Sequence, residues 1–282
     1  MADNVHGIVA GLETSFPIAM LMSALLSIAF FSALELYVWI LSTFRKRRGL
    51  YFWSLIVATS GIILNGLGYT LKFFRVTTES FFSVTIICLG WTCMVTGQSV
   101  VLYSRLHLVV TNEKLLHCVL TIIVINALAI HIPVTVLVYF VNSPDPRRFV
   151  DPYEIYERTQ LVIFAVQEAL ISGIYIYYAK DILTTLDEMR KRPRRAVMKQ
   201  VIYINIILMA LDSILIGLQF AGLYEVQTSL KPAIYGLKLK LEFNVLNQLL
   251  RATKDRSQDI FFCWSGADTL NSQFVQSCNV LP

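Results

Sequence analysis

The stretch LHCVLTIIVINALAIHIPVTVLVYFV, from Leu116 to Val141, contains no Asp, Glu, Lys or Arg in 26 residues. A helix of that length rises about 39 Å, more than the ~30 Å thickness of the hydrocarbon core of a bilayer. Lipid offers the backbone no hydrogen-bond partner, so an apolar segment crosses a bilayer as a helix whose own backbone groups pair. The stretch therefore predicts a membrane-spanning helix.

Six more runs of mainly apolar residues have the length that a spanning helix needs, about 20 residues. They are Pro17–Leu41, Leu50–Phe74, Phe81–Tyr103, Leu161–Leu183, Val201–Leu223 and Pro232–Leu250. The last run is the least apolar because it contains Lys238, Lys240 and Glu242. Together the seven runs predict an all-α fold, a polytopic membrane protein built as a seven-transmembrane-helix bundle over residues 17–250.

The composition of the whole chain agrees with a membrane protein. Of the 282 residues, 56% are hydrophobic and 15% are charged, and the mean hydropathy is +0.61, whereas about 25% of the residues of soluble domains are charged. With 13 Gly, 8 Pro and 5 Cys, the chain is neither collagen-like nor a disulfide scaffold. We therefore expect an integral membrane protein, in the plasma membrane or another membrane of the secretory pathway.

The basic residues predict how the bundle is oriented. If the N-terminus is outside, sixteen of the 24 Lys and Arg residues lie on the cytoplasmic side, six lie outside and two lie within the last span. Cytoplasmic loops are enriched in positive residues, so we expect residues 1–16 to be an extracellular tail and residues 251–282 a cytoplasmic tail. A secretory signal begins with a basic region, which residues 1–16 lack, so the first span is expected to stay as an anchor.

Two basic runs lie beside the predicted spans on the cytoplasmic side, Arg45–Arg48 and Arg190–Lys199. Each positive charge near an anionic bilayer surface contributes about 1 kcal/mol of attraction. We therefore expect the lipid bilayer to be a partner, with anionic lipid at these loops, and we expect no nucleic-acid partner. Cys263, in the tail cluster Phe261–Trp264, is a candidate for acylation, and an unmodified tail is the alternative.

The longest predicted outer connection is Asn142–Gln160. It carries four acidic residues and three arginines, namely Asp145, Asp151, Glu154, Glu157, Arg147, Arg148 and Arg158. This segment either caps an outer cavity or is a solvated connection between two spans.

Four acidic residues lie inside predicted spans, where a charged side chain at a helix centre costs about 2.5–3.5 kcal/mol on insertion scales. They are Glu35, Glu168, Asp212 and Glu242. Each is a candidate for binding a ligand or lining a cavity, because a costly intramembrane charge is usually functional. The alternative for each is a purely structural hydrogen bond between helices.

Polar residues in the last span fall on two nearly opposite faces of the helix. One face carries Lys240, Asn244, Asn247 and Arg251, and the other carries Lys231, Tyr235, Lys238 and Glu242. Two such faces cannot both contact lipid, so we expect this helix to pack between neighbours or to line a water-filled cavity. The candidate cavity residues here are Lys238, Lys240, Glu242 and Asn244. Depth along the helices predicts an ion pair of Asp212 with Lys240, and Lys238 is the alternative partner.

The third predicted span carries a candidate switch. Gln98 and Ser99 lie within the span, and Arg105 lies at its cytoplasmic end, where an arginine can contact a neighbouring helix or a cytoplasmic signalling partner. The residue before it is Ser104 instead of an acid, so a lock between adjacent acid and arginine residues is missing. The alternative is an arginine that only anchors the helix at the membrane interface.

No sequence motif for a metal, a cofactor or a covalent catalyst is present. The four His residues are dispersed without metal-ligand spacing, and P-loop, G-x-S-x-G and dinucleotide motifs are missing. Retinal is not expected, because no Asp precedes Lys238 or Lys240 by four residues and residues 81–103 hold no carboxylate to serve as a counter-ion. We expect no cofactor and no metal, and we assign no catalytic residue.

Three predicted spans contain strings specific enough to compare with known families. They are Gly90-Trp91, Thr96-Gly97-Gln98-Ser99, Leu102–Val109, Glu168–Gly173 and Leu239–Leu249. These strings resemble an uncharacterised fungal family of seven-transmembrane integral membrane proteins, over roughly residues 17–252. The resemblance implies a seven-helix membrane fold. Because that family lies loosely near fungal receptor-like surface-sensing proteins, it also implies a role in sensing.

Three functions are left open by these features. The leading one is an orphan receptor-like protein in which an outer or mid-membrane cavity senses a small molecule. The second is an integral membrane enzyme of the terpene-cyclase type, in which Glu35, Glu168 or Asp212 protonates a bound polyene. The third is a small transporter that uses Asp212 and the last helix.

Overall fold

The computed structural model describes residues 16–44, 49–73, 80–107, 109–110, 112–142, 148–188, 192–223, 226–245 and 247. Its helices include α1 (Phe16–Thr43), α2 (Leu50–Phe73), α3 (Ser80–Leu106), α4 (Glu113–Val141), α5 (Val150–Glu188) and α6 (Arg192–Phe220). A further helix follows over residues 226–245. These ranges contain no β-strand, so the predicted all-α fold is confirmed.

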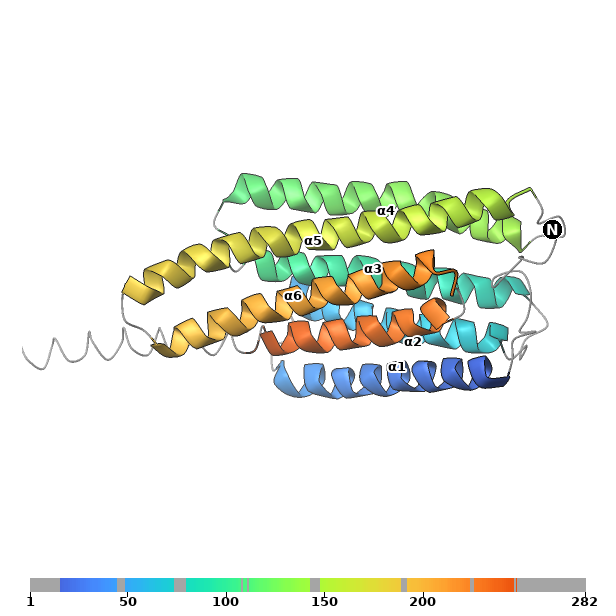
Figure 1. Ribbon diagram of the computed structural model, residues 1–282, viewed down its shortest axis with the longest axis horizontal. Coiled ribbons are helices and arrows are strands. Elements are labelled where there is room, and N and C mark those ends of the chain that lie inside the picture. The colour runs from blue at the N-terminus through green and yellow to red at the C-terminus, as the bar shows by residue number, and fades with distance from the viewer. Residues whose placement is uncertain are drawn as a thin grey trace, which may run out of the picture.

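The helices run up and down along one long axis, each antiparallel to the one before it (Figure 1). We call the end of the bundle where α1, α3, α5 and helix 226–245 begin the first end, on the right in Figure 1. The opposite end, where α2, α4 and α6 begin, is the second end. Helix 226–245 lies beside α6, so residues from these helices can meet in the interior.

The outside of the bundle is apolar, as a lipid-facing surface requires. Ile125, Leu128 and Ile132 on α4 are each more than half exposed, and six helices are long and apolar enough to cross a membrane. These properties indicate an integral membrane protein. Helix 226–245 is not among the six, since Lys231, Lys238, Lys240 and Glu242 interrupt it. The count of seven spans, the orientation and the division into two tails and a membrane domain stay predictions.

Helix α5 starts much earlier than hydropathy predicts. It begins at Val150, eleven residues before the predicted start at Leu161, so the expectation of a continuous outer connection up to Gln160 is wrong. Hydropathy detects only the apolar part of a helix. A segment with polar side chains can also be helical, and hydropathy does not detect it. Glu157 and Gln160 are accordingly buried on this first part of α5.

Glycine residues allow α2 and α3 to pack closely. A Cβ atom added at Gly90 would lie 2.7 Å from the Cα of Asn65, and one at Gly97 would lie 2.8 Å from the Cα of Ala58. Both distances are shorter than a van der Waals contact between carbon atoms, so only glycine permits this approach. The side-chain amide of Asn65 also donates to the backbone oxygen of Ile87 across this contact at 3.3 Å.

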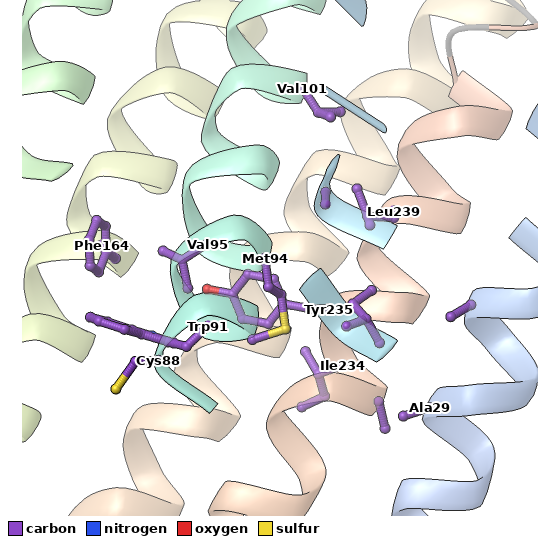
Figure 2. Close-up of a cluster of buried hydrophobic side chains, with 14 of the residues drawn as sticks. Ala29, Cys88, Trp91, Met94, Val95, Val101, Phe164, Ile234, Tyr235 and Leu239 are labelled. Carbon is purple, nitrogen blue, oxygen red and sulfur yellow. The ribbon is translucent and has the colours of Figure 1, made fainter. Parts of the chain in front are cut away.

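The hydrophobic core is built around α3 and helix 226–245. Figure 2 shows Trp91 and Met94 of α3 in a cluster with Tyr235 and Leu239 of helix 226–245 and with Phe164 of α5. These side chains are at least 90% buried. Helix 226–245 is therefore an interior element that packs between neighbours, and Lys238 and Glu242 are buried on it whereas Asn244 is exposed.

Some predictions concern residues outside the ranges that the structure describes. They are the basic residues Arg45–Arg48, Arg190 and Lys191, the N-terminal residues 1–15, and the C-terminal residues 251–282 with Cys263 and Arg251.

Candidate functional site

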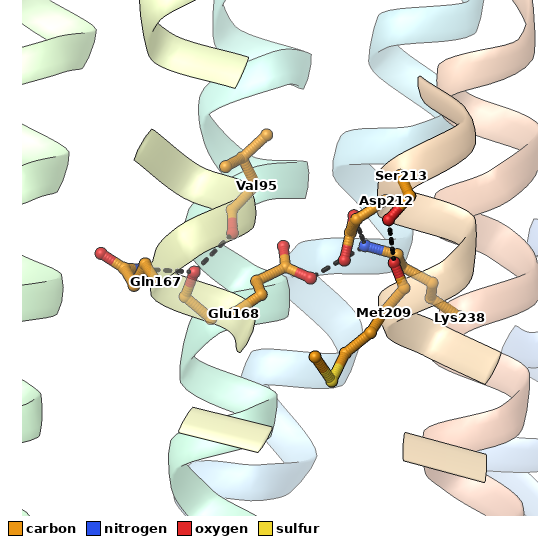
Figure 3. Close-up of polar contacts among 8 residues, drawn as sticks. Val95, Gln167, Glu168, Met209, Asp212, Ser213 and Lys238 are labelled. Carbon is orange, nitrogen blue, oxygen red and sulfur yellow. Dashed lines mark hydrogen bonds and ion pairs between the residues drawn. The ribbon is translucent and has the colours of Figure 1, made fainter. Parts of the chain in front are cut away.

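Lys238 on helix 226–245 lies between two acidic residues in the interior of the bundle (Figure 3). Its Nζ donates to Oε2 of Glu168 on α5 at 2.8 Å and also to Oδ1 of Asp212 on α6. The side chain of Lys238 is fully buried, that of Glu168 is 5% exposed and that of Asp212 is 13% exposed. One ammonium group thus connects three helices. We call Glu168, Asp212 and Lys238 the central layer.

A chain of neutral hydrogen bonds extends from the central layer to α3 and α4. Gln167, the neighbour of Glu168, donates from Nε2 to Oγ of Ser99 at 3.0 Å. Its Oε1 accepts from Nδ2 of Asn126 on α4 at 2.8 Å. Ser99 in turn donates to the backbone oxygen of Val95 at 3.2 Å (Figure 3). These hydrogen bonds connect α5 to both α3 and α4 beside the central layer.

Arg105 forms a second charged layer, closer to the second end. Its Nη1 lies 2.6 Å from Oε2 of Glu242, and the two side chains are 1% and 0% exposed. Since Nη1 makes no aligned hydrogen bond, this contact is an ion pair. Nη2 donates to Oδ1 of Asn205 on α6 at 2.7 Å, and the guanidinium lies 4.5 Å from the ring centre of Tyr175 on α5. We call these four residues the arginine layer.

The two layers are linked by the spacing of residues along three helices. Tyr175 follows Glu168 by seven residues on α5, and Asp212 follows Asn205 by seven on α6. Seven residues are about two turns, which keeps both members on one face at about 10 Å separation. On helix 226–245, Glu242 follows Lys238 by one turn, about 6 Å. The two layers are therefore closer together along helix 226–245 than along α5 and α6. The long side chains of Lys238 and Arg105 span this difference.

A separate ion pair lies at the side of the bundle. Nζ of Lys240 donates to Oε2 of Glu35 on α1 at 2.5 Å, with side-chain exposures of 16% and 31%. The rings of Phe31 and Trp39 lie about 6 Å from the same ammonium group. The preferred pairing of Asp212 with Lys240 is therefore wrong, and the alternative partner, Lys238, is the one observed. Lys238 and Lys240 are two residues apart and point to different sides of the helix, which a comparison of depths cannot distinguish.

The candidates from the sequence are brought together to different degrees. The four intramembrane acids form ion pairs with Arg105, Lys238 or Lys240. Gln98 is 1% exposed, and neither polar atom of its amide has a hydrogen-bond partner. Asn244 is exposed and does not join the layers. Arg105 is buried and paired, so the alternative of an arginine that only anchors the helix at the interface is wrong.

Several interior polar residues were missed in the sequence. Asn205 and Tyr175 complete the arginine layer, and their spacing of seven from Asp212 and Glu168 is the signal that could have found them. Glu157 and Lys231 are 5% and 9% exposed and interact electrostatically. They were assigned to an outer loop and to a helix end, where burial was not expected.

A small cavity lies near the first end of the bundle. Its volume is about 30 Å³, and its lining includes Trp91, Glu157, Gln160 and Lys231. That volume accommodates a small number of water molecules. In the described part of the chain, no group of three or more His, Cys, Asp or Glu side chains could hold a metal ion.

Comparison with known protein families gives one match. The model of a family described as "Domain of unknown function (DUF7703)" matches residues 10–261 of this chain. No curated protein matches the chain. The match confirms membership of an uncharacterised family, whereas fungal origin and receptor-like character stay expectations.

Proposed function

The chain belongs to the DUF7703 family, and we propose that it is a receptor-like membrane protein whose arginine layer is a conformational switch. A small molecule sensed in the first-end or central part of the bundle would change the position of the helices that meet at Arg105. A cytoplasmic signalling partner would then bind at the second end. One observation carries the proposal: the buried side chain of Arg105 connects α3 to both α6 and helix 226–245.

The buried position of Arg105 supports a switch with two distinct states. A guanidinium cannot lose its proton, so it must keep a partner or become hydrated when the helices separate. A partial separation of the helices would leave the guanidinium with neither a partner nor water, which costs several kcal/mol. Intermediate positions are therefore disfavoured, and a ligand that favours one arrangement shifts the population of the two states.

The location of the layer agrees with the predicted orientation. The second end is the cytoplasmic end if the N-terminus lies outside, as the distribution of basic residues predicts. A change in the distance between α3 and α6 at that end would alter the surface offered to a cytoplasmic partner.

A distance measurement between two spin labels tests the proposal. The labels are attached at His107→Cys, directly after α3, and at Gln200→Cys on α6, two exposed positions, after the five native cysteines are replaced by serine. In Arg105→Gln we expect a second, longer distance population beside the native one, because the link between α3 and α6 is lost. The matched control is Arg158→Gln, which removes an arginine from an exposed pair with Glu154 and should leave one population.

Melting of each variant establishes that the bundle is folded under the conditions of the distance measurement. A single, unchanged distance in folded Arg105→Gln would contradict the proposal and leave Arg105 as a static structural residue. The same label pair can be used in a screen of small molecules, where a sensed ligand should change the ratio of the two populations.

The terpene-cyclase alternative is less well supported by the geometry. A cyclase acid must direct its proton at a bound substrate, whereas the carboxyl groups of Glu35, Glu168 and Asp212 are each directed at a lysine. Product analysis after incubation with polyene diphosphates and with uncharged polyenes tests this alternative directly.

The transporter alternative is supported by the stacking of ionisable residues along the bundle axis. Lys231 and Glu157, the central layer and the arginine layer follow one another from the first end toward the second. A proton flux into liposomes that contain the purified protein, abolished by Asp212→Asn, would favour transport. A receptor-like protein should give no flux above that of empty liposomes.

A further inference from the structure

The two charged layers contain more acidic than basic residues. Glu168, Asp212 and Glu242 carry carboxyl groups, whereas only Lys238 and Arg105 carry positive charges. If all five were ionised, the interior would hold one uncompensated negative charge. Such a charge is costly inside a bilayer. A buried positive counterpart is therefore required, either a bound monovalent cation or a proton.

The geometry of the central layer favours a proton. The carboxyl groups of Glu168 and Asp212 both contact Nζ of Lys238, so the two groups converge on a single ammonium nitrogen. Two ionised carboxylates that share one buried cation repel each other, so a proton on one of them stabilises the arrangement. The ammonium group of Lys238 already occupies the position between the two groups that a metal ion would need.

Among the residues that the structure describes, the surroundings of the pair supply no further positive charge close by. On helix 226–245 the titratable groups near it are Tyr235, which interacts electrostatically with Glu168 and Asp212, Lys238 and Glu242. On α3 the nearest charge is Arg105, which Glu242 already neutralises. Within the described residues, Lys238 is thus the one cation that contacts either carboxyl group, and it cannot balance two negative charges.

We propose that Glu168 and Asp212 form a carboxyl pair that binds one proton, shared between them and held beside the charged Lys238. With this proton the two layers are neutral as a whole. Release transfers the proton from the carboxyl pair to a water molecule, which leaves two carboxylates and a hydronium ion. Asp212 is the exchange point, since its side chain is 13% exposed whereas Glu168 is 5% exposed. Oε1 of Glu168 has no hydrogen-bond partner and can accept from such a water molecule.

Proton binding would be linked to the arginine layer. Glu242 interacts electrostatically with both Glu168 and Lys238 and lies one turn from Lys238 on the same face of helix 226–245. Loss of the shared proton adds a negative charge next to Glu242 and draws Lys238 and water toward the pair. The bound proton therefore stabilises the arrangement in which Arg105 and Glu242 are paired. The site itself does not depend on Arg105 acting as a switch.

Infrared spectroscopy of the whole protein in lipid nanodiscs at pH 8 tests the proposal. An ordinary Asp or Glu is ionised at that pH, so a carbonyl band of a protonated carboxylic acid identifies a retained proton. We expect this band in the native protein, with a shift in D₂O and a further shift when Asp or Glu is labelled with carbon-13. We expect it to disappear in both Glu168→Gln and Asp212→Asn. The matched control, Glu35→Gln, removes an acid that pairs with Lys240 and should keep the band.

Two results would overturn the proposal. The first is the absence of the band from the native protein, a measurement that needs no variant and so does not depend on a variant folding. The second is a band that both Glu168→Gln and Asp212→Asn retain.

Melting in sodium chloride and in choline chloride distinguishes the two positive counterparts. We expect equal melting temperatures in both salts. If sodium clearly raises the melting temperature and the band of a protonated acid is absent, the positive counterpart is a bound sodium ion and the proposed proton is ruled out. Neither experiment reports on the distance between α3 and α6, so failure of the proton site and failure of the receptor-like switch are distinguishable.

Discussion

Replacement of Arg105 and Glu242 by methionine, singly and together, should reveal how strongly the buried pair holds the bundle. The two charged atoms are 2.6 Å apart and the side chains are 1% and 0% exposed. Removing one partner of a buried pair destabilises by about 3–5 kcal/mol, because the other charge is left without compensation. Removing both leaves mainly the lost hydrogen bond to Asn205, about 1–3 kcal/mol. The double variant should therefore lose several kcal/mol less than the sum of the single variants.

The two single variants should differ in their dependence on pH. In Arg105→Met the isolated Glu242 can take up a proton in the folded protein, whereas the same carboxyl group is ionised in the unfolded chain above its ordinary pKa. In that pH range the free-energy cost of the uptake rises by about 1.4 kcal/mol per pH unit. Between pH 6 and pH 8 this variant should thus lose about 2.7 kcal/mol of stability relative to the native protein. In Glu242→Met the isolated arginine cannot lose its proton, so no such slope is expected.

Equilibrium unfolding in mixed micelles, followed by tryptophan fluorescence at pH 6, 7 and 8, provides the measurement. Arg158→Met is the control. It removes an arginine from a pair whose side chains are 49% and 48% exposed, and the cost should stay below about 1 kcal/mol at every pH. Additive losses in the double variant, or equal pH slopes for the two single variants, would show that Arg105 and Glu242 do not form a buried pair.

Three further predictions concern packing, topology and lipid binding. Gly90→Ala should destabilise by about 1–3 kcal/mol or more, because its Cβ would lie 2.7 Å from a backbone atom of α2; Gly173→Ala, with nothing within 4 Å, should be neutral or slightly stabilising in the same melting assay. A reporter inserted in residues 143–147 should be extracellular and one in residues 251–282 cytoplasmic; finding both on one side would contradict seven spans. Replacing the five Arg and Lys residues between 190 and 195 with Gln should weaken sedimentation with anionic vesicles and reduce its salt dependence, and unchanged binding would mean that this run only sets topology.

The amino-acid sequence determined the fold class because hydropathy is a local property. A run such as Leu116–Val141 must be helical in lipid whatever its neighbours are. The two ends of this apolar run therefore locate α4 to within a few residues. The start of α5 was missed because residues 150–160 are helical without being apolar: Glu157 and Gln160 are buried, whereas most of the other polar side chains of this segment are exposed. Whether a polar side chain faces a neighbouring helix is not a property of the segment that carries it.

The same distinction applies to the candidate site. Charged residue types inside apolar runs identified Glu168, Asp212 and the lysines of the last helix, because an intramembrane charge is costly wherever it points. The tertiary structure alone decided the partners: Asp212 pairs with Lys238, and Lys240 pairs with Glu35. Depth follows from position in the sequence, but pairing also needs the rotation of each helix about its axis and the identity of the helix beside it. Both are set by packing among all the helices at once, which no single stretch of sequence contains.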